Sequence, residues 1–268
     1  MADLKDKKRE TLSAALMVKN AEKKVRACLE SVKWADEIIV VDGQSTDKTV
    51  EICREYTDKI YVNEFGGDFG NERQFAADKA SCDWVLELDA DEVVSEGMRK
   101  EIEKILAGEK DAGYAAFKFK RKNYFLGHFM EYGGWYCYYL IFFKKARAHY
   151  DGRVHHTLTV DGEIGEIDAD LLHFPVDDLH EFIERHNRYT TLEAEELVAK
   201  RGVISEKELR RHLIIKPLKF FWKTYVRKKA YKEGFYGLVF AVYFAFYDFL
   251  RWAKYWQIVR NKYEKKKG

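Results

Sequence analysis

Three acidic residues end an apolar run in the stretch WVLELDADE, residues 84–92. Asp89 and Asp91 are two residues apart, so in an extended chain their side chains point the same way while Ala90 points oppositely. Two converging carboxylates repel each other unless a cation lies between them, and such hard oxygen ligands suit Mg²⁺ or Mn²⁺. A diphosphate would complete the metal's coordination shell. The pattern indicates a metal-bound nucleotide; the alternative is that both acids only cap the next helix.

The elements that would position these acids alternate between strand and helix. Apolar runs at residues 12–18, 37–42 and 83–89 are separated by helical patterns, which predicts an α/β fold with a mostly parallel central sheet. Ligands of open α/β sheets bind beyond the carboxyl ends of the strands. Asp42 and Asp89 each end one of these runs, so we expect both acids at that edge of the sheet.

Later segments are expected to extend the sheet and to add helices. Strands are expected at residues 60–64, 113–120, 138–144 and 157–160, and helices at 96–106, after Asp178 and after Ser205. Gly202 suits the end of the helix that follows Asp178. Ser205-Glu-Lys-Glu208 is a capping-box pattern, which predicts that a new helix begins there.

The C-terminal quarter of the chain differs in charge from the rest. Residues 205–268 contain 17 Lys and Arg against 5 Asp and Glu, a net charge of +12 in a chain of net charge +2. Such a split calls for a polyanionic partner at one end of the molecule. The uncharged run from Gly234 to Tyr247 is shorter than the roughly 20 residues of a spanning helix. We therefore expect amphipathic helices that lie on an anionic membrane surface.

Other roles for this basic, aromatic segment are a core helix packed on the α/β domain or a contact in a homo-oligomer. A nucleic-acid partner is not expected, because the uncharged run is too apolar for a phosphate groove and no nucleic-acid motif is present. The first ten residues, MADLKDKKRE, lack the apolar core of a signal peptide. The expected location is therefore the cytoplasm, at the inner face of the cell membrane.

Several ordered motifs resemble glycosyltransferase family 2. VVDGQSTDKTVEIC is similar to the family's nucleotide-sugar strand, and WVLELDADE is similar to its metal-binding strand. GDFGNERQFAADKASCDW and YGGWYCYYLIFFKKARAHYDGRVHHTL resemble two further family segments. The combination, over roughly residues 12–190, is most similar to the bacterial lipopolysaccharide-core β-1,4-glucosyltransferase subgroup. The resemblance implies a GT-A nucleotide-sugar-binding fold and transfer of a sugar from a nucleotide donor.

The resemblance also implies roles for individual residues. Asp42 would contact the uracil or ribose of the donor, and Arg73 would lie near the nucleotide. Asp89 would lie by the ribose and diphosphate, and Asp91 would coordinate the metal ion. His173 is a further candidate ligand, because several transferases of this fold complete the metal shell with a late histidine. A lone histidine beside Leu and Phe is more often a packed core residue.

The catalytic base is the point where the sequence departs from the subgroup. His156 stands where the subgroup commonly has a glutamate that could remove a proton from the acceptor hydroxyl. Histidine can do this work, because its unperturbed pKa is about 6.5. His155 shares the candidacy, both histidines could instead form only local hydrogen bonds, and Glu131 and Asp151 are rivals.

These observations predict a metal-dependent inverting glycosyltransferase. Residues 1–204 would form the GT-A domain, and residues 205–268 a helical segment for membrane association or oligomerisation. The donor would be a nucleotide sugar, expected to be a UDP-sugar of glucose or a related hexose. The acceptor would be a lipid-linked glycan such as lipopolysaccharide core. The rivals are a sugar nucleotidyltransferase and a non-catalytic membrane-associated scaffold.

Overall fold

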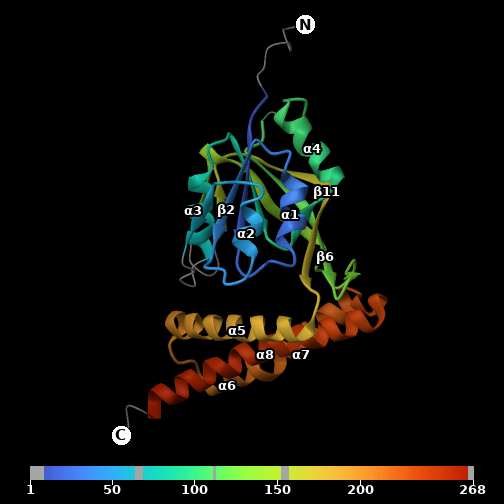
Figure 1. Ribbon diagram of the computed structural model, residues 1–268. Coiled ribbons are helices and arrows are strands. Elements are labelled where there is room, and N and C mark those ends of the chain that lie inside the picture. The colour runs from blue at the N-terminus through green and yellow to red at the C-terminus, as the bar shows by residue number, and fades with distance from the viewer. Residues whose placement is uncertain (1–8, 64–68, 111–112, 152–156, 265–268) are drawn as a thin grey trace. The chain divides into compact units, whose positions relative to one another are not determined.

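The computed structural model describes residues 9–63, 69–110, 113–151 and 157–264 (Figure 1). The chain forms two compact units, and neither is a continuous piece of sequence. The first contains Met1–Lys122 and Cys137–His173, and the second contains Asn123–Tyr136 and Phe174–Gly268. The boundary predicted at residue 204 falls inside the second unit, in the loop that follows its first long helix. The predicted domain assignment stays a prediction.

A large mixed sheet forms the centre of the first unit. Its strand order is β3-β2-β1-β4-β8-β6-β11-β5, and β7 pairs with β6. The bounds are β1 Leu12–Val18, β2 Glu37–Asp42, β3 Ile60–Val62, β4 Trp84–Asp89, β5 Glu92–Val94, β6 Ala116–Phe125, β7 His128–Phe129, β8 Cys137–Lys144 and β11 Ile164–Val176. The strands β3, β2, β1 and β4 are parallel, whereas β8 pairs antiparallel with β4 and with β6. A separate antiparallel pair consists of β9 Ala148–Asp151 and β10 Thr157–Val160.

Helices cover both faces of this sheet (Figure 1). Their bounds are α1 Val25–Val32, α2 Thr49–Cys53, α3 Phe69–Lys79 and α4 Glu96–Leu106. One buried cluster joins α1, α2 and α4 to the sheet through residues such as Leu29, Cys53 and Met98. The other face packs on α3 through Ala76 and Ala77. Parallel strands buried on both faces explain why β1, β2 and β4 are continuous apolar runs in the sequence.

Helices make up most of the second unit. Its α-helices are α5 Leu179–Arg201, α6 Glu206–Arg210, α7 Lys216–Trp222 and α8 Gly234–Glu264, with π turns at Arg211–Ile215 and Lys223–Arg227 and a 3-10 turn at Ala230–Glu233. The Asp178 side chain accepts from the backbone N–H of Glu181 at the start of α5, and Ser205 does the same with Glu208 at α6. Gly202 follows α5 with φ 61°. The helix starts and the end expected from the sequence are therefore confirmed.

α8 is longer than the uncharged run within it. The 31-residue helix continues through Asp248, Arg251 and Lys254, and side chains of α5 pair with Arg251 and Lys254. Arg251 lies 3.1 Å from a carboxylate oxygen of Glu193, and Lys254 donates to Thr190 at 2.8 Å. Residues 230–262 form a helical stretch long and apolar enough to cross a membrane by length and composition alone. Such a stretch is weak evidence, because core helices of soluble proteins pass the same test.

Candidate active site

Two of the predicted acids lie at the same edge of the sheet. β1 lies between β2 and β4, with Val18 opposite Asp42 and Met17 opposite Asp89. Both acids therefore lie at the edge of the sheet formed by the C-terminal ends of the parallel strands, as expected from the sequence. Neighbouring strands are about 4.8 Å apart, so two strand spacings put the two backbones about 10 Å apart. A ligand that touched both acids would have to extend across the end of β1.

Asp42 is buried and has a local structural task. Its carboxylate accepts the backbone N–H of Ser45 at 3.1 and 3.2 Å, which fixes the turn after β2. The side chain is 3% exposed and lies near Cys53, whose pKa is raised to about 11 by burial and by the Asp42 charge. Asp42 thus stabilises a turn in the structure, and its role in nucleotide binding stays a prediction.

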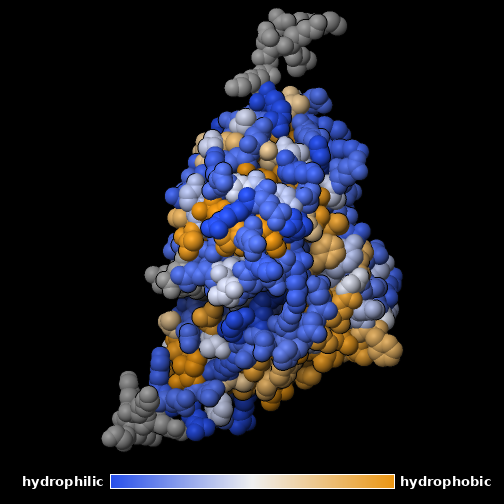
Figure 2. Space-filling model, viewed as in Figure 1, coloured by the Kyte–Doolittle hydropathy of each residue, from blue (hydrophilic) through white to orange (hydrophobic). Residues whose placement is uncertain are grey.

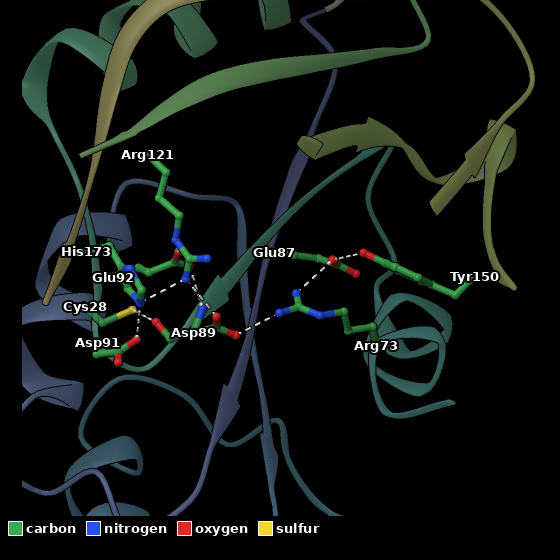
Figure 3. Close-up of polar contacts among 9 residues, drawn as sticks. All are labelled: Cys28, Arg73, Glu87, Asp89, Asp91, Glu92, Arg121, Tyr150 and His173. Atoms are coloured by element: carbon green, nitrogen blue, oxygen red, sulfur yellow. Dashed lines mark hydrogen bonds and ion pairs between the residues drawn. The ribbon is translucent and has the colours of Figure 1, made fainter. Parts of the chain in front are cut away.

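Asp89 lies between two arginines that come from different elements (Figure 3). Nη2 of Arg73, on α3, is 2.9 Å from Oδ1 of Asp89, and Nη2 of Arg121, on β6, is 3.1 Å from Oδ2. Burial raises the pKa of Asp89, but the two guanidinium charges outweigh it and hold that pKa below its usual range. The carboxylate is therefore ionised and held in one orientation at the end of β4.

Asp91 and His173 are also brought together. Nε2 of His173 lies 3.4 Å from Oδ1 of Asp91, because β11 pairs with β5 and places His173 opposite Glu92. Nη2 of Arg121 lies 2.9 Å from the same Nε2. A guanidinium has only donors, so Nε2 must be the acceptor in this contact. Burial and the Arg121 charge lower the pKa of His173 against the opposing effect of Asp91, which favours a neutral imidazole.

Five residues drawn in Figure 3 were not predicted as site residues from the sequence: Cys28, Glu87, Glu92, Arg121 and Tyr150. Oε1 of Glu92 lies 2.6 Å from Nε of Arg121, and its other oxygen accepts the Asp89 N–H at 2.8 Å. Burial, opposed by Arg121, raises the pKa of Glu92 to about 8. Glu87 is fully buried, accepts from the Tyr150 hydroxyl and lies 3.3 Å from Nη1 of Arg73. Burial raises the pKa of Glu87 to about 7.

A sequence signal for two of these residues exists in hindsight. Glu87 is a charged residue inside the buried strand WVLEL, and a buried carboxylate requires a partner. Arg121 gives a weaker signal, because it lies in KFKRKN, where several cations alternate with few apolar residues. Only the pairing of β6 with β8 and β11 shows that the Arg121 side chain, and not that of Lys120, reaches the acids.

The residues at this edge fit a divalent cation that takes most of its ligands from a substrate. The cluster contains four carboxyl groups and two guanidinium groups, and a bound cation would favour the ionised forms of Glu87 and Glu92, whose pKa values burial raises to about 7 and about 8. Asp91 and His173 would supply two ligands, and Mg²⁺ sites commonly combine one or two protein carboxylates with substrate phosphates and water. Within the described ranges, the structure contains no group of three or more His, Cys, Asp or Glu side chains arranged to hold a metal.

The predicted base lies where the structure gives no description. His155 and His156 both fall outside the described residues, as does the side chain of Asp151. Glu131 is exposed and belongs to the second unit. The identity of the base therefore stays a prediction from the sequence.

Comparison with known proteins places these features in a family. A family model described as "Glycosyl transferase family 2" matches residues 13–162. An uncharacterized glycosyltransferase of Rickettsia bellii is 30% identical over 271 residues, covering 95% of this chain and 88% of that protein. LpsC of Rhizobium meliloti, described as a lipopolysaccharide core biosynthesis glycosyltransferase, is 28% identical over 255 residues, covering 92% of each chain.

Among solved structures, TarS 1-349 of S. aureus in complex with UDP-GlcNAc superposes with a TM-score of 0.45. The sequence identity is 14%, and the superposition covers 95% of this chain and 92% of that one. The family relationship rests on the sequence matches and not on this superposition.

Proposed function

Since the chain belongs to glycosyltransferase family 2, and is thus a glycosyltransferase with a GT-A fold, we propose that it is a metal-dependent, inverting hexosyltransferase. The donor is a UDP-sugar of glucose or a related hexose, and the acceptor is a lipid-linked glycan such as lipopolysaccharide core. The acceptor assignment is supported by the function in the name of LpsC, a relative that matches 92% of this chain.

The arrangement around Asp89 is the observation that carries this proposal. Asp89 is held between Arg73 and Arg121 at the carboxyl edge of the sheet, with Asp91 and His173 beside it. Asp42 would receive the nucleoside at the end of β2, and Asp89, at the end of β4, would lie by the ribose and diphosphate. The two arginines can donate to phosphate oxygens, which a carboxylate cluster alone would repel.

Asp91 and His173 would hold the cation. A divalent ion bound there would neutralise charge on the diphosphate that leaves when the sugar is transferred. The protein's own groups position the donor and exclude competing orientations, since Asp89 is fixed by two charged partners. His156 or His155 would take the proton from the acceptor hydroxyl, with Glu131 and Asp151 as rivals for that role.

The proposed location is the inner face of the cell membrane, where the protein would be peripheral. A lipid-linked acceptor has to be reached at a membrane surface, and the basic C-terminal segment suits anionic headgroups.

The deciding experiment measures donor turnover with the full-length protein. UDP-glucose and related donors are incubated with a lipopolysaccharide-core acceptor, with Mg²⁺, with Mn²⁺ and with EDTA, and products are identified by mass spectrometry. The proposal expects metal-dependent release of UDP and a glycan that is heavier by one hexose. Release of pyrophosphate would indicate a nucleotidyltransferase instead. The absence of nucleotide binding in a calorimetric titration would indicate a scaffold.

A further inference from the structure

The second unit exposes an apolar stripe along α8 that faces away from α5. The helix buries one stripe against α5, where Trp252 and Tyr255 pack on Ala194 and Val198. A second set of apolar residues recurs at intervals of three, four or seven positions, which places them on one face of the helix. These exposed residues are Phe235, Val239, Val242, Phe246, Phe249 and Trp256. Phe235 is 84% exposed, which is unusual for so large an apolar side chain.

α7 and the π turn before it extend this surface. Ile214, Leu218 and Trp222 are spaced four residues apart and are more than half exposed. Between α7 and α8 lies an open groove of about 380 Å³. Its lining is entirely apolar: Leu213, Ile214, Pro217, Leu218, Phe221, Val242, Ala245, Phe246 and Phe249. We call the exposed residues of both helices, together with this groove, the α7–α8 face; apolar residues gather there in Figure 2.

Positive charge is concentrated in the segment that carries part of this face, and one of its cations, Lys232, lies 4.6 Å from the centroid of the Tyr132 ring. Residues 211–232 contain eight Lys and Arg and no Asp or Glu, and all eight cations are exposed. They are Arg211, Lys216, Lys219, Lys223, Arg227, Lys228, Lys229 and Lys232. In the part of the chain that the structure describes, none of the eight forms an ion pair. Elsewhere surface cations are often paired, as Lys100 is with Glu96 and Arg210 with Glu206.

We propose that the α7–α8 face docks flat on an anionic phospholipid bilayer, with hydrocarbon chains entering the groove and the eight cations contacting the headgroups. Charge complementarity favours a bilayer as the partner. Apolar and aromatic side chains suit the acyl chains, and neighbouring Lys and Arg side chains suit the anionic headgroups. This inference rests on the proposed function in one respect: a membrane-bound enzyme reaches a lipid-linked acceptor.

The geometry favours flat docking over a helix that spans the membrane. The other side of α8 is bound to α5 through polar contacts, including Tyr247 to Glu193 at 2.7 Å and Arg251 to Glu193 at 3.1 Å. α5 carries many charged side chains that face water, among them Glu184 and Lys200. A spanning α8 would have to break these contacts or take α5 into the hydrocarbon, where charged side chains are costly.

The test is vesicle co-sedimentation of the full-length protein. Vesicles of phosphatidylcholine are compared with vesicles that also contain phosphatidylglycerol, at low and high salt. We expect binding to the anionic vesicles that salt weakens. Phe246→Ser should weaken that binding by about tenfold, because one large apolar side chain no longer enters the bilayer. The double variant Lys219→Glu with Lys223→Glu should bind anionic vesicles more weakly than Phe246→Ser does at low salt. At high salt the double substitution should have little effect, because salt screens the charges.

Each variant has a matched control. Ile183 on α5 is 49% exposed and Phe246 is 52% exposed, so Ile183→Ser removes a comparable apolar side chain outside the α7–α8 face. Lys100→Glu with Lys104→Glu, on α4, changes the net charge by the same amount. Both controls should sediment like the unchanged protein. Equal loss in the controls, or no binding by the unchanged protein, overturns the proposal.

Two further measurements separate the possible failures. Analytical ultracentrifugation tests a second copy of the chain as the occupant: a dimer that Phe246→Ser dissociates would overturn docking on lipid. UDP release from the donor without vesicles should be the same in the unchanged protein and in Phe246→Ser. Normal UDP release without vesicle binding refutes only this inference, whereas vesicle binding without any donor turnover refutes only the proposed function.

Discussion

Nη2 of Arg121 lies 2.9 Å from Nε2 of His173, the nitrogen that also faces Asp91. Because Nε2 accepts from the guanidinium, its lone pair is already used. A metal ion that bound His173 through Nε2 would have to displace Arg121 from this contact. Arg121 also pairs with Asp89 and Glu92, so it stabilises the cluster and lowers its affinity for other cations.

Replacing Arg121 by methionine should therefore have two opposite effects. Binding of Mn²⁺ in the absence of nucleotide should become tighter, on the order of tenfold, because a competing cation is gone. The free energy of unfolding should fall by about 3–5 kcal/mol, because Asp89 and Glu92 lose a buried partner. Electron paramagnetic resonance and urea denaturation measure the two effects. Lys120→Met is the control, since Lys120 lies on the same strand and pairs with the exposed Asp168; unchanged Mn²⁺ affinity in Arg121→Met would refute the competition.

Asp91→Asn should abolish metal-dependent transfer while the fold is retained. The neutral amide keeps the shape of the side chain but loses the charge that a hard cation requires, a loss of several kcal/mol or about a thousandfold in rate. Transfer rates at saturating metal and circular dichroism check the two parts. Asp168→Asn is the matched control, because its side chain is 79% exposed on β11. Full activity of Asp91→Asn would remove the argument for a metal at this edge.

Glu37 predicts how stability depends on pH. Burial raises its pKa, but hydrogen bonds from Lys59, Ser13 and Ser81 outweigh burial and lower the pKa to about 2 from 4.5. A carboxylate whose pKa is lower in the folded protein than in the unfolded chain stabilises the fold at every pH above its unfolded-state pKa. This stabilisation is lost as the pH falls from about 4.5 towards 2. Glu37→Gln should therefore cost about 2–3 kcal/mol at pH 7 and progressively less in acid.

Denaturant titrations at several pH values provide this measurement. Glu103→Gln is the control, because Glu103 forms only a surface pair with Arg99 and should change stability by less than about 1 kcal/mol. A cost for Glu37→Gln that stayed constant from pH 7 to pH 3 would contradict the assignment.

Gly237 is a position where no side chain fits. A Cβ added there would lie 1.7 Å from the carbonyl oxygen of Ala230, and this oxygen belongs to the backbone and cannot rotate away. Gly237→Ala should lower the stability of the second unit by about 1–3 kcal/mol. Gly97→Ala in α4 should instead stabilise by up to about 1 kcal/mol, because its Cβ would meet only Ser95 Oγ at 3.9 Å. Thermal unfolding compares the two; a neutral Gly237→Ala would contradict the predicted clash.

The elements that depend on local chemistry could be predicted from the sequence. The acid-tipped strands and the N-caps at Asp178 and Ser205 follow from short-range patterns, and the structure contains all of them. β11 was missed, although buried Gly165, Ile167 and Leu171 alternate there with charged residues. The pairing of β11 with β5 is long-range, so the approach of His173 to Asp91 had no local signature.

The full length of α8 was not predictable from its apolar run for a related reason. Asp248, Arg251 and Lys254 end that run. In the structure Arg251 pairs with Asp248 within α8 and with Glu193 of α5, and Lys254 donates to Thr190 of α5, so two of the three charges have partners that lie far away in the sequence. The role of Arg121 was not predictable for the same reason. Its sequence neighbours Lys120 and Lys122 are also basic, and only the pairing of the strands determines which of these side chains faces the acids.

The chain passes between its two compact units three times, after residues 122, 136 and 173. Neither unit can therefore be isolated by one cut in the gene. A fragment that stopped at residue 204 would keep α5 but lose α8, leaving Phe182, Ala194 and Val198 without their cover. Such a product should aggregate or be degraded in the cell. Limited digestion of the intact protein should accordingly yield fragments that stay associated until they are denatured.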